Sequence, residues 1–294
     1  MVDLLGLTVI IMTVINTIIM IVIIIKSAAK INGDGAFWVL KRVKEVNPMK
    51  IKGSVALVTG ANGGIGRAFV RELLKRGATK IYLGARDPAS LRGLFTESNK
   101  LVPITLDVTN AKQIEEAAKT ASDITLLINN AGMVAFSGAL AAKDTSAARQ
   151  EMEVNYFGVL ALTQALRGTP AFRSGGAIVN ILSFLALATL PVAGTYSASK
   201  SAVLALTRTL RAELKPRGVQ VVGVLPVQTD TPAYAPLPEP KLKPEEVAAS
   251  TLDGVEAGEE DVFPGALSRG AADAFKNDPA ALQARMSTVV HAID

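Results

Sequence analysis

The sequence predicts a three-layer α/β fold, a doubly wound parallel sheet of the Rossmann type preceded by an N-terminal transmembrane helix. Three observations lead to this prediction. An uncharged apolar segment opens the chain, short β-branched runs alternate with helix-length segments after residue 52, and a glycine-rich turn follows the first run. We therefore expect a membrane anchor at residues 1–30, a basic linker at residues 31–51 and one α/β domain at residues 52–294.

The N-terminal apolar segment is long enough to cross a bilayer. Residues 4–25 form a run of 22 residues without a charge, which at about 1.5 Å per residue spans roughly 33 Å, close to the hydrocarbon thickness. A signal peptide, a misassigned start and a buried core helix are the alternatives. A signal peptide has a shorter apolar region behind a basic start, whereas this start carries Asp3. We expect a single-pass membrane protein that contacts the lipid bilayer through residues 4–25.

Basic residues gather directly after this segment. Residues 26–52 contain seven lysines and arginines against Asp34 and Glu45, a local charge of +5 that equals the formal charge of the whole chain. Basic flanks stay on the cytoplasmic side, so we expect the α/β domain to face the cytoplasm. A juxtamembrane basic cluster attracts anionic lipids. The charge therefore gives no reason to expect a nucleic-acid partner.

The composition excludes several kinds of chemistry. With 49% hydrophobic and 19% charged residues, the chain is not disordered. The absence of cysteine excludes disulfides, thiolate catalysis and cysteine zinc sites, and the single histidine, His291, lies near the C-terminus. We expect no metal site. An enzyme of this composition must transfer protons through other side chains.

Six runs predict the strands of the sheet, and helix-length segments separate them. These runs are residues 54–60, 80–85, 101–108, 124–132, 177–183 and 219–226. Parallel sheets of this kind bind ligands beyond the carboxyl ends of their strands. Residues 225–244 hold six of the fourteen prolines and follow the last run. We expect them to form a loop over the ligand crevice.

The turn after the first strand carries three glycines, Gly60, Gly64 and Gly66, at the start of an expected amphipathic helix. Glycines permit tight turns and close approach of backbone amides to a pyrophosphate, which sits at the helix N-terminus. A tight turn without a ligand is the alternative, since three residues separate the first two glycines, unlike the G-x-G-x-x-G fingerprint.

The end of the second strand bears on the choice of cofactor. A dinucleotide fold that selects NAD tends to place an acid there, but this chain has Arg86, which suits the extra phosphate of NADP. Asp87 is adjacent and could bind the ribose hydroxyl instead. NADP(H) is favoured, and NAD(H) stays open.

Tyr196 and Lys200 lie one helical turn apart in the stretch Thr195–Ala202. A free tyrosine has a pKa of about 10, and a nearby ammonium favours its ionised form. Lys200 at position i+4 lies on the same helix face and can supply that charge. A packed and solvated neighbour pair is the alternative. Ser183, which ends the fifth run, could hydrogen-bond a substrate oxygen or cap a helix.

Five motifs in order resemble those of the classical short-chain dehydrogenase/reductase family over residues 52–294. They are T-G-x-x-x-G-x-G at residues 59–66, N-N-A-G at residues 129–132, Asn155, Ser183 and Y-x-x-x-K at residues 196–200. The resemblance implies an NAD(P)(H)-dependent oxidoreductase that interconverts a carbonyl and an alcohol. It implies Tyr196 as the acid or base, with Ser183 and Lys200 beside it and Asn155 completing a water-mediated proton path from Lys200.

The same resemblance implies a cofactor site along the carboxyl edge of the sheet. Asp107 would contact the adenine, Thr59 would brace the glycine turn, and Thr229 or Thr231 would face the nicotinamide carboxamide. Val227 follows Pro226 where a glycine is common. The expected cofactor-binding residues are Thr59, Gly60, Asn62, Gly64, Ile65, Gly66, Arg86, Asp107, Val108, Asn130, Ala131, Gly132, Tyr196, Lys200, Pro226 and Thr229.

The substrate is expected to be lipophilic, because residues 184–190 and the proline-rich loop are almost wholly apolar. A long-chain aldehyde, a sterol or a retinoid-like ketone would fit, and a preference for NADP would favour reduction. The resemblance also implies a homodimer or homotetramer. A non-catalytic NADP-binding scaffold or sensor, and a membrane-tethered interaction protein, are the alternative functions.

Overall fold

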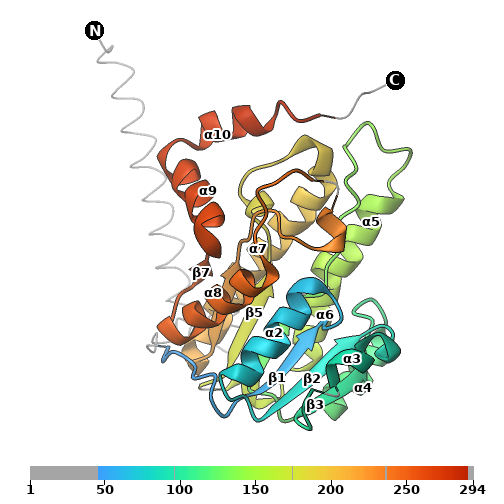
Figure 1. Cartoon of the computed structure of the whole chain (residues 1–294), viewed down its shortest axis with the longest axis vertical. Coiled ribbons are helices and arrows are strands. Elements are labelled where there is room, and N and C mark those ends of the chain that lie inside the picture. The colour runs from blue at the N-terminus through green and yellow to red at the C-terminus, as the bar shows by residue number, and fades with distance from the viewer. Residues whose placement is uncertain (1–45, 96, 174, 236, 291–294) are drawn as a thin grey trace, which may run out of the picture. The chain divides into compact units, whose positions relative to one another are not determined.

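The computed structural model describes residues 46–95, 97–173, 175–235 and 237–290 (Figure 1). The predicted membrane span at residues 4–25 and the linker as far as residue 45 lie outside them. Within these ranges, no helix combines the length and the apolar character that a membrane crossing requires.

A parallel sheet of seven strands forms the centre of the α/β domain, in the order β3-β2-β1-β4-β5-β6-β7. The strands are β1 Val55–Thr59, β2 Lys80–Ala85, β3 Leu101–Thr105, β4 Leu126–Asn129, β5 Ala177–Ile181, β6 Gln220–Val224 and β7 Asp261–Val262. The six predicted strands are confirmed, β2 with the predicted bounds and the other five with shorter ends. The edge strand β7 was not predicted, because two residues carry no periodic signal.

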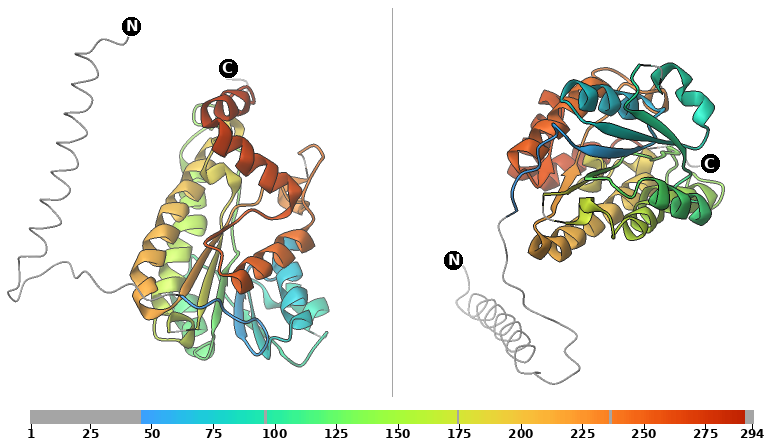
Figure 2. Two further views of the ribbon diagram at one scale, coloured as in Figure 1. Left: turned by 90° about the vertical axis from the view of Figure 1, so that its left-hand side faces the viewer. Right: turned by 90° about the horizontal axis from the view of Figure 1, so that it is seen from below.

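Helices cover both faces of this sheet, as Figure 2 shows. The helices of the described residues are α2 Gly64–Lys75, α3 Arg92–Phe95, α4 Ala111–Thr120, α5 Ser146–Met152, α6 Gly158–Ala165, α7 Gly194–Leu214, α8 Pro244–Ala257, α9 Gly265–Asn277 and α10 Pro279–Met286. A π-helical turn, Glu153–Phe157, joins α5 to α6. The predicted doubly wound, three-layer arrangement is confirmed.

The alternation of side chains along the strands divides the core into two layers. Val58 of β1 packs in one layer with residues of α2 and α8, such as Phe69 and Leu252. Leu57, its neighbour in the chain, packs in the other layer with residues of α4, α6 and α7, such as Leu162. Successive side chains of a strand point to opposite faces, so hydrophobic runs without alternation suit strands that are buried on both sides.

Several loops that carry predicted site residues meet at the carboxyl edge of the sheet. The glycine turn follows β1, the N-N-A-G segment follows β4, Ser183 follows β5, and the proline-rich loop runs from β6 to α8. The strand order reverses between β1 and β4, the position where ligands bind in open α/β sheets.

Candidate functional site

The glycine turn brings the start of α2 close to the end of β1. Gly60 has a φ of 62°, which side chains rarely tolerate. A Cβ added to Gly66 would lie 2.2 Å from the carbonyl oxygen of Gly60, so only glycine fits. Among the described residues, no side chain caps the N-terminus of α2 and its first turn holds no acid. Its backbone amides therefore form a potential anion site. Asn62 is exposed and Ile65 packs partly on the core.

Thr59 and Asn130 tie the end of β1 to the loop after β4. The Thr59 hydroxyl accepts hydrogen bonds from the backbone amides of Asn130 and Ala131, both at 2.9 Å. The Asn130 side chain donates to the carbonyl oxygens of Thr59 at 2.8 Å and Gly60 at 3.3 Å. The glycine turn is therefore braced by Asn130, whereas the hydroxyl of Thr59 contacts the exit of β4. Thr59, which precedes Gly60, and Asn130 thus both tie the start of the glycine turn to the loop after β4.

The residues after β2 and β3 differ in how far they are engaged. Arg86 is exposed at the end of β2. The carboxylate of Asp87 accepts the amide of Ala89 at 2.9 Å and so caps a 3₁₀ turn. Asp107 accepts the amide and the hydroxyl of Thr109, at 2.9 and 2.7 Å. Val108 is buried against Gly158, with no space for a Cβ there. Of the two residues after β2, Arg86 is thus the more available for a ligand.

Tyr196 and Lys200 lie on α7, below the loops that follow β4 and β5. Both are buried. The ammonium of Lys200 donates to the carbonyl oxygen of Ile181 at 2.8 Å and lies 5.7 Å from the centre of the Tyr196 ring. Ser183 interacts with the Tyr196 hydroxyl and accepts the amide of Leu185 at 3.1 Å. Ser183 therefore caps a turn and also faces Tyr196.

Asn155 sits within the π-helical turn, a conformation frequent at functional sites. Its side chain accepts the amide of Met133 and donates to the carbonyl oxygen of Met133, both at 2.9 Å, and it donates to Ser199 at 2.9 Å. A Cβ added to Gly132 would lie 3.2 Å from Asn155 Oδ1 and 3.5 Å from Lys200 Nζ. Asn155 and Lys200 thus meet at the backbone of the loop after β4.

Burial governs the protonation of the two groups on α7. It raises the pKa of Tyr196 well above its ordinary value of 10.0, and the interaction with Ser183 lowers it by less. It lowers the pKa of Lys200 from 10.5 to about 8. In the protein alone, Tyr196 is therefore a protonated acid at neutral pH. The hydrogen bond and the charge interaction with Tyr234 raise the pKa of Tyr196 further.

The loop after β6 holds the expected nicotinamide contacts. Pro226 is buried and its carbonyl oxygen accepts the amide of Phe184 at 2.8 Å. Thr229 is 2% exposed and its hydroxyl donates to the carbonyl oxygen of Val227 at 3.1 Å. Thr231 lies over the glycine turn, since its methyl group would be 2.9 Å from a Cβ on Gly64. Of the two threonines, Thr231 is thus the one beside the glycine turn.

Three residues at this site were missed by the sequence reasoning. Tyr234 of the proline-rich loop donates a hydrogen bond to the Tyr196 hydroxyl at 3.0 Å. The Phe136 ring packs edge-on to Tyr234, with centroids 5.7 Å apart. Glu151 of α5 is fully buried. The position of Glu151, one helical turn before Asn155 in the chain, was the available signal.

The apolar segment after β5 contacts the two C-terminal helices, α9 and α10. Phe184 is buried and packs edge-on to Phe275 of α9, with centroids 6.4 Å apart. The Gln283 side chain of α10 accepts the amide of Thr189 at 2.8 Å and donates to its carbonyl oxygen at 2.9 Å. In Figure 1, α10 lies at the same end of the domain as the site loops.

The sequence of this chain matches a known protein family and known relatives. The family model described as short chain dehydrogenase matches residues 54–241. An uncharacterized oxidoreductase of Staphylococcus aureus is 34% identical over 213 residues, which cover 67% of this chain and 89% of the relative.

Two solved structures of dehydrogenases are also similar to this chain. A short chain dehydrogenase from Burkholderia cenocepacia in complex with NADP is 44% identical with a TM-score of 0.76, covering 81% of this chain and 99% of its own. An alcohol dehydrogenase from Thermococcus sibiricus complexed with 5-hydroxy-NADP is 27% identical with a TM-score of 0.64, covering 71% and 94%.

Proposed function

The chain belongs to the short-chain dehydrogenase family, and we propose that it is an NADP(H)-dependent oxidoreductase that interconverts a carbonyl and an alcohol, with Tyr196 as the acid or base. The observation that carries the proposal is the convergence of Ser183, Tyr196, Lys200 and Asn155 at the carboxyl edge of the sheet. The helix α7, the π-helical turn and the segment after β5 supply them, and each lies close to another member or to the loop after β4.

Tyr196 would protonate the oxygen of a substrate carbonyl as it is reduced. Burial raises the pKa of Tyr196, so the phenol carries its proton at neutral pH. Ser183, which faces the same hydroxyl, would hydrogen-bond the substrate oxygen and hold it in reach. Positioned donors of this kind act on the charge that develops in the transition state.

Lys200 and Asn155 would restore the proton on Tyr196. A pKa of about 8 leaves Lys200 mostly protonated at neutral pH, yet able to give up its proton more easily than an exposed lysine. The Asn155 amide lies beside it at Gly132. We infer that this pair leads a water-mediated proton path to Tyr196, with Asn155 holding the path in place.

The residues present fit NADP. The backbone of Gly60, the close packing at Gly66 and the uncapped N-terminus of α2 form a cradle for a pyrophosphate. Exposed Arg86 would hold the 2′-phosphate, and Gly132 and Lys200 would contact the nicotinamide ribose. When bound, NADPH supplies the hydride. The NADP complex of the Burkholderia cenocepacia relative supports this choice.

The substrate would be lipophilic and the reaction a reduction. Phe184 and its apolar neighbours lie in the chain between Ser183 and Thr189, the residue that Gln283 binds. They would therefore form one wall of the substrate site. A long-chain aldehyde, sterol or retinoid-like ketone would suit such a wall. Residues 4–25 would anchor the protein in the bilayer as a single span with its α/β domain in the cytoplasm, and the protein would assemble as a homodimer or homotetramer.

Oxidation of NADPH by the full-length protein tests this function. We would supply aliphatic, aromatic and sterol carbonyls, with NADH as the comparison cofactor and Tyr196→Phe as the matched variant. We expect NADPH to be preferred and kcat to fall about 10²- to 10⁴-fold in the variant, the usual contribution of a general acid, while NADPH still binds. Binding of NADPH without turnover of any carbonyl would instead favour a scaffold or sensor.

A further inference from the structure

Tyr234 contributes a second phenol to the site. It lies in the turn Pro232–Tyr234 of the proline-rich loop, 38 residues after Tyr196, and its hydroxyl donates to Tyr196 Oη at 3.0 Å. We propose that Tyr234 is a positioning residue that directs the hydroxyl proton of Tyr196 toward the substrate. This inference rests on the proposed function of Tyr196 as the acid.

The argument follows from the hydrogen-bonding capacity of a phenol. A tyrosine hydroxyl has one proton to donate and lone pairs that accept. Because Tyr196 accepts from Tyr234, its own proton must point away from that phenol. Within the described residues, Ser183 also hydrogen-bonds the Tyr196 hydroxyl, whereas Glu151 acts on it only through charge. The proton of Tyr196 is thus turned to the side where Ser183 would hold the substrate oxygen.

A second aromatic ring packs against Tyr234 and restricts its orientation. Phe136 packs edge-on against it, at a centroid distance of 5.7 Å, an arrangement that favours one relative orientation of the two rings. Phe136 has a φ of 48°. Bulky residues rarely adopt this left-handed conformation, and surrounding structure must hold it.

Glu151 supplies part of that support. Its Oε1 accepts the amide of Ala135, the residue before Phe136, at 2.8 Å. Four residues further on, Asn155 grips Met133 through two hydrogen bonds. Two side chains from α5 and the π-helical turn therefore hold the loop after β4 at alternate residues. Glu151 thus holds Ala135, whose neighbour Phe136 packs on Tyr234, and Tyr234 bonds Tyr196.

Tyr234→Phe tests the proposal, since it keeps the ring against Phe136 and removes one hydroxyl. Tyr82→Phe is the matched control, because the Tyr82 hydroxyl donates to Asp123 at 2.8 Å, far from the site in the sheet. The chain has four tyrosines, so carbon-13 NMR of full-length protein labelled at tyrosine Cζ gives a resonance for each. Variant spectra assign them.

We expect Tyr234→Phe to move the Tyr196 resonance and to lower kcat about two- to tenfold, the range for one neutral hydrogen bond, with KM within a factor of two. Tyr82→Phe should change neither. An unmoved Tyr196 resonance would overturn the proposal. So would a higher kcat or a lower KM, since Tyr234 would then merely obstruct the site. The resonance shift needs no substrate, so a wild-type protein without turnover would count against the proposed function alone.

Discussion

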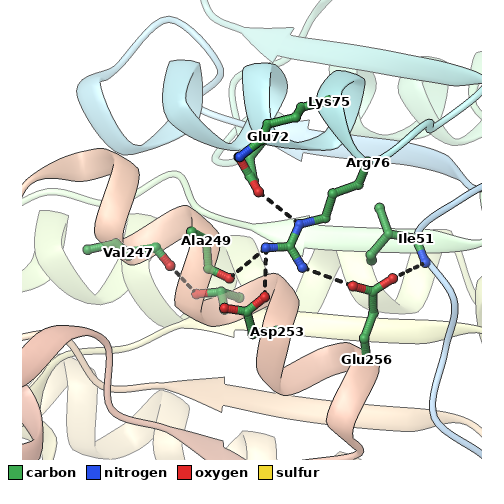
Figure 3. A network of polar contacts seen from close by, with 9 residues as sticks. Ile51, Glu72, Lys75, Arg76, Val247, Ala249, Asp253 and Glu256 are labelled. Carbon is green, nitrogen blue, oxygen red and sulfur yellow. Dashed lines mark hydrogen bonds and ion pairs between the residues drawn. The ribbon is translucent and has the colours of Figure 1, made fainter.

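Charged side chains at the two edges of the sheet differ in whether oppositely charged groups pair with them. At the amino edge, the Arg76 guanidinium pairs with Glu72, Asp253 and Glu256 at 2.8–2.9 Å and joins the ends of α2 and α8 (Figure 3). At the carboxyl edge, Lys200 is buried with a lowered pKa, and Glu151 Oε2 has no hydrogen-bond partner within the described ranges.

This difference indicates that the charges at the amino edge contribute to stability, whereas those at the carboxyl edge are kept for function. Burial alone would lower the pKa of Arg76, but its three carboxylate partners outweigh burial and raise it. Its charge is thus compensated where it lies. Among the described residues, no carboxylate pairs with Lys200, which donates to the carbonyl oxygen of Ile181 instead. Phe136 adds strain nearby through its positive φ. Proteins retain such unfavourable features mainly where chemistry requires them. Substitutions at the two edges should therefore have opposite consequences.

The largest effect is expected for Lys200→Met, which removes the buried charge. Activity should fall at least about 100-fold, as for loss of a group in acid–base catalysis. Stability should rise. Since the folded pKa of about 8 lies below the ordinary 10.5, the unfolded chain binds more protons between these values. The buried charge therefore lowers the free energy of unfolding by its full amount, about 3 kcal/mol, at any pH below 8.

Urea unfolding of both proteins as a function of pH measures this. The lost hydrogen bond to Ile181 removes about 1 kcal/mol, so we expect a net gain of about 2 kcal/mol at pH 7. The gain should shrink as the pH rises from 8 to 10.5, because the wild-type lysine loses its charge in that window. An advantage that did not depend on pH would show that the buried charge is not its source.

Arg76→Met should give the opposite result at the amino edge. The Arg76 side chain is 17% exposed. Its loss leaves the carboxylate of Glu72, which is 15% exposed, near the more exposed carboxylates of Asp253 and Glu256. We expect the free energy of unfolding to fall by about 2 kcal/mol, with kcat and KM unchanged for any substrate that the wild-type protein turns over. A change in kcat larger than twofold would mean that the two edges are coupled.

The sequence could predict the six longer strands and the glycine turn after β1, because both depend on local patterns. Continuous β-branched runs marked the six longer strands, and the glycines marked the turn at β1. The partners of several residues depended on contacts far apart in the chain. The hydroxyl of Thr59 turned out to contact residues 71 and 72 positions away.

The missed residues share the same cause. Tyr234 lies in a proline-rich loop, whose path depends on irregular contacts within the loop such as the pairing of Thr229 with Leu242. Glu151 is an acid on a helix, which is typical of an exposed face. Its burial follows from the loop after β4 that covers it. Neither fact has a signature in local periodicity.

The smallest effect is expected for Gly270→Ala, and it sharpens the contrast between a glycine that the site requires and one that it does not. Gly66 in α2 has no space for a Cβ, whereas a Cβ on Gly270 in α9 would meet no atom within 4 Å. Alanine in a helix is more favourable than glycine by about 0.5–1 kcal/mol. Urea unfolding should show Gly270→Ala to be more stable by that amount with unaltered kinetics. A loss of stability or activity would mean that α9 makes a contact at Gly270 in the assembled protein, which would place the C-terminal helices in an interface.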